Sequence, residues 1–247
     1  MEMAFHGAAY AGWQKQPNEN TVQAEVEKAL TTALQASTGC TGAGRTDSGV
    51  HASHFIAHFD TNEIKKTKQF IFKLNQLLPH DISVTDVYKV KDEAHARFDA
   101  TARSYEYYVT QKKDPFLLDR ATFIKKPLSI DLMNKAAKEL MNFTNFKSFS
   151  KVKTQVYTFN CEVKSAIWEQ KENVLVFKIK ADRFLRNMVR AIVGTLIEVG
   201  LRMKSIEEFV EVIKSENRNN AGKSMPAHAL FLSEIDYPQH LKLHHGR

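Results

Sequence analysis

The sequence predicts an α+β fold made of two similar α/β domains, each with an antiparallel or mixed sheet packed by helices. Helical and strand-like patterns mix along the whole chain, without the strict alternation that builds a parallel sheet. The chain has 247 residues, 43% of them hydrophobic, which is enough for one large domain or two small ones. A faint duplication predicts an N-terminal domain over residues 1–95, a C-terminal domain over residues 96–238 and a flexible tail over residues 239–247.

Two helices are predicted in the first half of the chain. Residues 20–36 carry apolar side chains at helical spacing, with Asn20 placed to cap the helix and Gln23 in the capping-box position. A shorter helical pattern covers residues 71–78. The segments with strand-like composition are residues 55–60, 82–90 and 104–110.

The second half repeats these themes. Ser205 is predicted to open a helix, because Glu208 completes a capping box and apolar residues follow on one face. A tight polar turn at Glu172 and Asn173 is expected to join two strands. The other predicted helices cover residues 130–142 and 182–199, and the predicted strands cover residues 157–169, 174–181 and 230–236.

Charge and composition narrow the functional classes. The chain has 35 Lys and Arg against 28 Asp and Glu, a net charge of +7, which favours a polyanionic partner such as nucleic acid or a membrane surface. Two cysteines do not form a disulfide framework, and no apolar run reaches the roughly 18 residues that a membrane span needs. We therefore expect a soluble, cytoplasmic protein with reduced thiols and no membrane partner.

The segment richest in glycine is the most unusual part of the sequence. Its letters, GAGRTDSGVHA, run from Gly42 to Ala52 and predict a tight loop that carries Arg45 and Asp47. It lacks the Gly-Lys-Ser/Thr ending of a phosphate-binding Walker loop. The loop is either a surface turn with a turn-favouring aspartate or a rigid platform that brings a carboxylate and a guanidinium to a ligand.

Three histidines lie at the end of this segment and just after it, at positions 51, 54 and 58. On a helix they would share a face and could bind a metal, but the segment alternates like a strand, and no cysteine or carboxylate cluster completes a ligand set. The sequence therefore favours packing or surface histidines and predicts no metal site.

Aromatic and basic residues in the second half offer further candidates. In the predicted strand RSYEYYV, Tyr105 and Tyr107 share one face and Tyr108 lies on the other; such rings pack in cores or stack on an extruded base. In the predicted helix over residues 182–199, one stripe carries three arginines that either face solvent or contact a carboxylate or phosphate: Arg183, Arg186 and Arg190.

These segments resemble one known family in order along the chain. GRTDSGVHA closely resembles the GRTDAGVHA signature of the pseudouridine synthase A family, with Ser48 in place of the usual alanine. The resemblance runs from Phe5 to Pro238 and includes AYAGWQKQPNENTVQAEVEKAL, LNQLLPHDISV, ARFDATARSYEYYV, FLRNMVRAIVGTLIEVG and SMPAHALFLSEIDYP. The family's early YDG appears as FHG at residues 5–7, and Met1 falls inside the expected first strand, so we expect one sheet to be weakened at its edge.

The resemblance implies a specific activity and assembly. Members of the family are homodimers with an active-site cleft at the junction of two α+β domains. They isomerise uridine to pseudouridine in the anticodon stem-loop of tRNAs, by detaching the base at N1, rotating it and rejoining it through C5. They use no cofactor and no metal.

The resemblance also assigns roles to individual residues. It makes Asp47 the catalytic aspartate, Tyr105 the tyrosine that stacks on the target base and Arg190 the cation that pairs with the aspartate. Arg45 matches the arginine that helps to extrude the base, and Arg183 and Arg186 are expected to contact phosphates. Two alternatives remain: a non-catalytic RNA-binding module on the same fold, and a metal-dependent hydrolase that uses the histidines.

Overall fold

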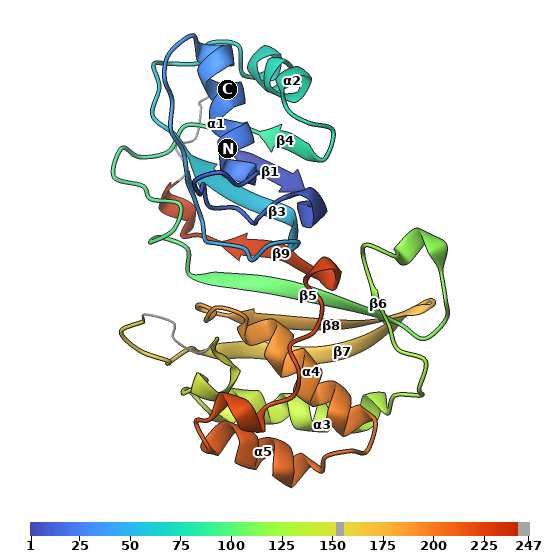
Figure 1. Ribbon diagram of the computed structural model, residues 1–247. Helices are drawn as coiled ribbons and strands as arrows, with labels where there is room; N and C mark the ends of the chain where they lie inside the picture. Colours follow the sequence, from blue (N-terminus) through green and yellow to red (C-terminus); the bar gives the residue numbers. More distant parts are fainter. Residues whose placement is uncertain (152–155, 242–247) are drawn as a thin grey trace. The chain divides into compact units, whose positions relative to one another are not determined.

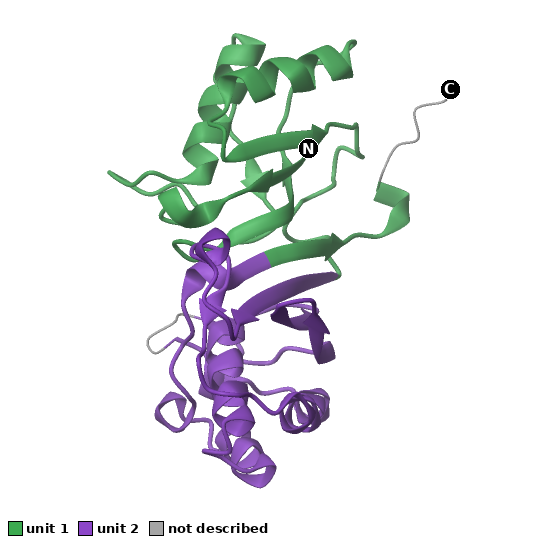
Figure 2. Ribbon diagram, turned by 90° about the vertical axis from the view of Figure 1, so that its right-hand side faces the viewer, with its two compact units in different colours: residues 1–101, 232–247 green, residues 102–231 purple. Residues whose placement is uncertain are grey.

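The computed structural model describes residues 1–151 and 156–241 and divides into two compact units (Figure 2). Unit 1 is Met1–Thr101 with the segment that begins at Leu232, and unit 2 is Ala102–Phe231. The mixture of helices and sheet strands in each unit agrees with the predicted α+β class. The units differ from the predicted division at residue 95, because the chain returns from unit 2 to place most of its last strand in unit 1.

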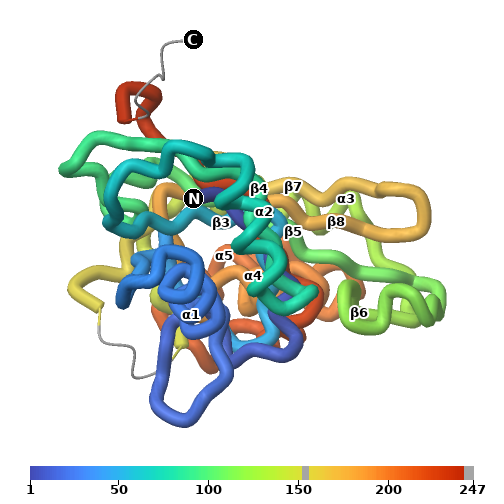
Figure 3. The backbone as a smooth tube through the Cα atoms, turned by 90° about the horizontal axis from the view of Figure 1, so that it is seen from above, coloured from blue at the N-terminus to red at the C-terminus, as the bar shows by residue number. Residues whose placement is uncertain are grey.

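The sheet of unit 1 has the strand order β4-β1-β3-β9. Its strands are β1 (Glu2–Phe5), β3 (His51–His58), β4 (Ile82–Asp86) and β9 (Leu230–Asp236), and the short β2 (Thr41–Gly42) pairs with β3. Strand β1 pairs antiparallel with both β3 and β4, so the first strand is an inner strand and not an edge. Helices α1 (Val22–Leu34) and α2 (Thr67–Leu77) pack against each other, and α2 also lies against β4 (Figure 1, Figure 3).

The sheet of unit 2 has the strand order β5-β8-β7, from β5 (Ala102–Thr110), β8 (Val174–Ala181) and β7 (Val163–Lys171); β6 (Thr122–Phe123) pairs parallel with β5. The predicted turn at Glu172 and Asn173 is confirmed, since β7 and β8 pair up to Lys171 and Val174. Helix α3 (Ile130–Glu139) packs on β7 and on α4 (Met188–Gly200), and α5 (Ile206–Lys214) packs on α3. Almost every residue of α4 is buried, which makes it the central helix of this unit (Figure 1).

Short 3₁₀ turns complete the fold. They cover Gly7–Ala9, Pro115–Leu117, Leu140–Asn142, Lys147–Phe149, Arg218–Asn220, Ala227–Ala229 and Gln239–Leu241. The last of them includes the start of the predicted tail, and Leu241 accepts a backbone hydrogen bond from Lys91. Residues 242–247 of that tail lie outside the described residues. In the part of the chain that the structure describes, no helix is long and apolar enough to cross a membrane.

The predicted cap of the first helix is wrong, whereas that of α5 is confirmed. Helix α1 begins at Val22, and Asn20 instead donates its side-chain amide to the Ala9 carbonyl. Gln23 lies in α1, but its side-chain amide makes no cap and donates to the Cys40 carbonyl at 2.8 Å. In α5 the capping box is complete, with Ser205 and Glu208 each bonding the other's backbone N–H.

Several strand and helix ends also differ from the predicted ones. Strand β3 begins at residue 51 and not at 55, β7 begins at residue 163 and not at 157, and α2 begins at residue 67 and not at 71. Strand β4 ends at residue 86, before the predicted end at 90. The predictions for β8 and β9 match their observed bounds.

The predicted helix over residues 182–199 is wrong over its first six residues. Helix α4 begins at Met188, after Asn187 takes a left-handed φ of 67°. The Asp182 carboxylate accepts the backbone N–H groups of Arg183 and Glu162, both at 2.7 Å, and thereby holds the segment in a non-helical path. Arg183 and Arg186 therefore lie before the helix and share no helical stripe with Arg190.

Candidate active site

The candidate residues divide between the two units. Arg45 and Asp47 belong to unit 1, on the loop between β2 and β3. Unit 2 carries the other candidates, which are Tyr105, Arg183, Arg186 and Arg190.

The Asp47 loop closes on itself and on residue 10. Val50 donates its backbone N–H to the Asp47 carbonyl at 3.2 Å, and Gly49, with φ of 78°, supplies the left-handed conformation that this turn needs. Gly49 also donates to the Tyr10 carbonyl at 3.2 Å, and the Ser48 hydroxyl donates to the same oxygen at 3.3 Å. The loop is thus a hydrogen-bonded turn with a fixed support.

Residues 7–13 form that support by direct backbone contact. Trp13 donates its backbone N–H to the Thr46 hydroxyl at 3.1 Å. A Cβ at Gly12, whose φ is 93°, would lie 2.2 Å from the Thr46 carbonyl oxygen, and a Cβ at Gly7 would lie 1.9 Å from that of Val50. The two glycines therefore let the support approach the loop on both sides of Asp47 more closely than any other residue would allow.

An aromatic cluster lies beneath this support. The Trp13 indole packs on Phe55 of β3 with ring centroids 4.2 Å apart, and Phe5 of β1 contacts both rings. Gly42 admits the indole, because a Cβ there would lie 2.5 Å from it. Trp13, Phe5 and Phe55 are all buried, so the core of unit 1 extends directly under the loop.

The residues of the loop differ in burial, with some anchored in the core and others facing solvent. Thr46 and Val50 are buried, Asp47 between them is half-buried and Arg45 is exposed. The carboxylate is therefore held on a short segment whose flanking residues are anchored in the core. This arrangement favours the platform over the ordinary surface turn.

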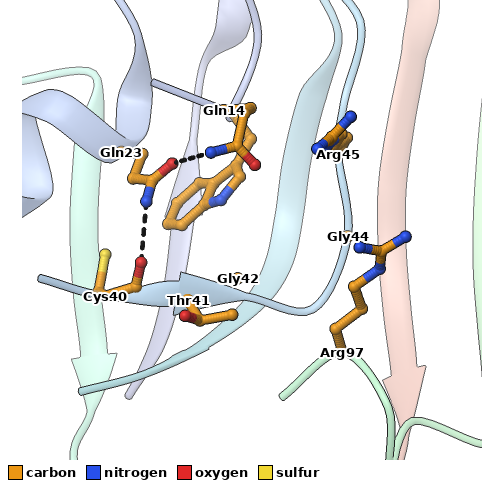
Figure 4. A pocket seen from close by; sticks show the side chains of 9 residues that line it. Gln14, Gln23, Cys40, Thr41, Gly42, Gly44, Arg45 and Arg97 are labelled. Atoms are coloured by element: carbon orange, nitrogen blue, oxygen red, sulfur yellow. Dashed lines mark hydrogen bonds between the residues drawn. The ribbon is translucent and has the colours of Figure 1, made fainter. Parts of the chain in front are cut away.

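A hollow of ≈ 100 Å³ opens beside Arg45 (Figure 4). At one end the Gln23 side chain accepts from Gln14 at 2.9 Å and donates to the Cys40 carbonyl; at the other stand Arg45 and Arg97. Gln23 is nearly buried and fully bonded, so it fixes the wall of the hollow. Two guanidinium groups at one end suit an anionic ligand.

In unit 2 the tyrosines of β5 have different environments. Tyr107 is buried, and its hydroxyl bonds the Thr122 hydroxyl at 2.6 Å and the Pro226 carbonyl at 3.0 Å. Burial raises the pKa of Tyr107, against smaller lowering effects of the Thr122 hydrogen bond and the Arg190 charge. Tyr108 bonds Glu106. The hydroxyl groups of Tyr107 and Tyr108 thus both form hydrogen bonds within unit 2.

Tyr105 lies two residues before Tyr107 on the same face of β5, as predicted. It is half-buried, and its ring meets Phe184 edge-to-face, with centroids 5.1 Å apart and planes at 87°. Phe184 thus buttresses the ring of Tyr105 from the side. Sequence reasoning did not single out Phe184, whose place depends on the non-helical segment before α4.

Arg190 lies in the first turn of α4 and is tied to a returning segment. Its Nε donates to the Met225 carbonyl at 2.6 Å, and its own carbonyl accepts the Met225 backbone N–H at 3.1 Å. The next carbonyl, that of Pro226, accepts from Tyr107. We call residues 222–226 the strap, because they link α4 to β5 at the position of Arg190.

The strap fits closely on α4. A Cβ at Gly194 would lie 1.9 Å from the Lys223 carbonyl oxygen, and Gly222 donates to the Thr195 hydroxyl at 2.9 Å. The hydroxyl of Ser224 accepts from Asn187 at 2.6 Å and from Arg218 at 2.7 Å. Sequence reasoning missed these positioning residues, although a glycine inside an apolar helix is a signal of close packing.

The histidines at positions 51, 54 and 58 each have a different partner in the structure. His51 is buried and accepts the Gly7 backbone N–H at 2.9 Å. His54 lies 3.9 Å from Glu2, and His58 accepts the Ala96 backbone N–H at 3.1 Å. Burial, and then the neighbouring His95, lower the pKa of His58. No group of three or more His, Cys, Asp or Glu that could hold a metal ion occurs among residues 1–151 and 156–241.

Comparison with known proteins gives consistent matches. Residues 136–238 match the sequence model of a family described as tRNA pseudouridine synthase. The chain is 49% identical over 240 residues to tRNA pseudouridine synthase A of Parabacteroides distasonis, covering 97% of this chain and 95% of the relative. It is 50% identical to the protein of the same name from Bacteroides fragilis, over 97% and 96% of the two chains. A more distant relative of that name, from Dictyoglomus thermophilum, is 38% identical over 96% and 98%.

Proposed function

The chain belongs to the tRNA pseudouridine synthase A family, and we propose that it isomerises uridine to pseudouridine in the anticodon stem-loop of tRNA. One observation carries this proposal: about half of the residues are identical to relatives of that name over nearly the whole chain. The loop that holds Asp47 supports it, because it presents one carboxylate on a rigid support.

The reaction rearranges one nucleotide without adding or removing atoms. The bond from the ribose C1′ to N1 of uracil breaks, the base turns, and a bond from C1′ to C5 forms. C5 loses its proton to solvent and N1 ends with a proton. A uridine in a stem must leave the base stack before these atoms are accessible, so the enzyme has to bind a flipped nucleotide.

We assign the chemistry to the Asp47 carboxylate. An ionised carboxylate can attack as a nucleophile, stabilise a developing positive charge on the sugar or remove a proton. Each of these roles requires the carboxylate to stay in place while the base turns. The buried anchors at Thr46 and Val50 provide that stability.

The remaining roles follow from the resemblance and the local geometry. Arg190 would pair with the carboxylate and favour its ionised form, and its bond to the strap holds its Nε in place. Tyr105 would stack on the uracil, with Phe184 supporting its ring. Arg45, exposed on the loop, would take part in base extrusion, and Arg183 and Arg186 would contact phosphates. The proposal thus requires side chains of both units to act on one uridine.

The proposed reaction uses no cofactor and no metal, and the working enzyme is proposed to be a cytoplasmic homodimer. A chelator should leave its rate unchanged. A rate that falls with chelation and returns with zinc would instead support the hydrolase alternative.

Tritium release tests the proposed function directly. Purified protein is incubated with tRNA labelled at C5 of uridine, and the released tritium is compared with the position of pseudouridine in the product. Release with pseudouridine in the anticodon stem-loop is expected. Tight tRNA binding without release would identify a non-catalytic RNA-binding module, and pseudouridine elsewhere in the tRNA would correct the proposed substrate region.

A further inference from the structure

A loop of unit 2 exposes apolar side chains that the proposed chemistry does not use. We call residues 111–126 the arm; it leaves the end of β5, passes through the 3₁₀ turn Pro115–Leu117 and returns through β6 (Figure 1). Three large apolar side chains of the arm are exposed: Phe116 at 88%, Leu118 at 71% and Phe123 at 48%. Apolar exposure on this scale within eight residues indicates a contact surface.

The arm is a defined turn. The Asp114 carboxylate caps the 3₁₀ turn by accepting the Phe116 backbone N–H at 2.9 Å. Ala121 donates to the Leu117 carbonyl at 2.9 Å, and Ala121 itself is buried. The two ends of the arm are joined where Gln111 donates its side-chain amide to the Lys126 carbonyl at 3.0 Å. The backbone thus holds Phe116 and Leu118 outward on a structured loop.

Basic side chains surround this apolar tip. The arm contains two acids, Asp114 and Asp119, and five basic residues, so its formal net charge is +3 (five minus two). One of the acids is already used as the cap. All five basic residues are exposed: Lys112, Lys113, Arg120, Lys125 and Lys126.

We propose that the arm is a second RNA-contacting site, in which its basic residues bind tRNA phosphates and Phe116 stacks on an unpaired base. This inference rests on the proposed function for the identity of its polyanion. Exposed aromatic rings among cationic side chains are the combination that holds single-stranded RNA segments. A second copy that met this arm across a twofold axis would bring another arm of charge +3 against it, and like charges would oppose that contact.

The arm acts away from the reacting base. Its first residue, Gln111, follows the end of β5 and is six residues beyond Tyr105, which at roughly 3.3 Å per residue is about 20 Å. Only the last part of the arm returns beside β5, where Thr122 pairs with Val109, and Phe116 precedes this part. The arm would therefore hold nucleotides other than the target uridine. Its loss should raise KM for tRNA and leave kcat nearly unchanged, because the lost contacts are equal in the bound and transition states.

The first test measures tRNA affinity with Phe116→Ala. A matched control is Met203→Ala, which removes a side chain of similar exposure, 66%, from unit 2 outside the arm. We expect Phe116→Ala to weaken tRNA binding about tenfold, as for one lost base stack, and Met203→Ala to leave it unchanged. Equal affinities for both variants and the wild type would overturn the stacking role.

The second test uses salt dependence. The double variant Lys112→Gln/Lys113→Gln should lower the slope of log affinity against log salt by about 1 to 2, since each phosphate contact contributes roughly 0.7 to 0.9. The control Lys135→Gln/Lys214→Gln removes two lysines that already pair with Asp131 and Glu211 on their own helices, and its slope should match the wild type. Equal slopes for all three proteins would overturn the phosphate contacts.

Direct binding separates this inference from the proposed function. If the wild type binds tRNA but forms no pseudouridine, the function fails while the arm variants still report on the arm. If Phe116→Ala leaves tRNA affinity intact but changes the sedimentation of the protein, the arm is a protein-contacting surface and the inference is wrong.

Discussion

The two units hold their candidate residues by different means. Unit 1 places Asp47 on an irregular loop, fixed by close backbone contacts at Gly7 and Gly12 and by the Thr46 hydroxyl. Unit 2 places Tyr105 inside a strand and Arg190 in the first turn of a helix, and uses the strap to orient the arginine. A loop lacks the repeating backbone hydrogen bonds that hold a side chain of a helix or strand in position. The position of Asp47 should therefore be more sensitive to an added methyl group than the positions of Tyr105 and Arg190.

The strongest expected effect of such a methyl group is at Gly12. Gly12→Ala places a Cβ 2.2 Å from the Thr46 carbonyl at a φ of 93°, so the loop beside Asp47 must shift. We expect kcat/KM to fall by at least about a hundredfold, which corresponds to roughly 2.7 kcal/mol or more of transition-state stabilisation. Tritium release measures this loss.

Gly44→Ala is the matched control, because a Cβ at Gly44 in the same loop would meet nothing within 4 Å. It should retain activity close to that of the wild type. Equal losses at Gly12 and Gly44, or none at either, would contradict the view that backbone contact with residues 7–13 positions Asp47.

A smaller effect is expected at Gly194. Gly194→Ala places a Cβ 1.9 Å from the Lys223 carbonyl, so the strap must move away from α4. We expect destabilisation by about 1–3 kcal/mol, as for overpacking of a core, and a loss of activity of about tenfold. Thermal unfolding measures the loss of stability, and tritium release measures the loss of activity. A stable variant with full activity would show that the strap does not position Arg190.

Much of the fold and of the site loop could be predicted from sequence. The capping box at Ser205 and the hairpin turn at Glu172 depend on local patterns, and both are present. The Gly-rich segment correctly predicted a loop, because three glycines within eight residues disfavour regular structure. The local sequence could not predict that Asp47 is half-buried between buried neighbours, because the groups that anchor this loop come from residues 7–13.

The errors at the start of α4 and at the cap of α1 share a physical cause. The periodicity over residues 182–199 predicts a helix, but the Asp182 carboxylate accepts the backbone N–H groups of Glu162 and Arg183, and the helix begins only at Met188. Arg183 and Arg186 therefore do not lie on a helical stripe with Arg190. The sequence predicts Asn20 and Gln23 as capping residues, but their side-chain amides donate to the distant carbonyls of Ala9 and Cys40. In each case a polar side chain found a tertiary partner that competes with the local pattern.

The smallest effect is expected at the position where the loop departs from the family signature. Ser48→Ala removes the 3.3 Å hydrogen bond to the Tyr10 carbonyl, but Gly49 still donates to that oxygen. We expect a stability change below about 1 kcal/mol and activity within about threefold of the wild type. A larger loss of activity would mean that the hydroxyl acts in the site beyond this bond.

The most direct test of the account compares the wild type with Asp47→Asn in two assays on the same tRNA, tritium release and equilibrium binding. We predict that the variant releases no tritium yet binds tRNA within a few-fold of the wild type, because the amide keeps the shape of the side chain while it lacks the charge and basicity of the carboxylate. Tritium release by Asp47→Asn at the wild-type rate would contradict the assignment of the chemistry to this carboxylate. Loss of both tRNA binding and tritium release would instead make Asp47 a structural residue.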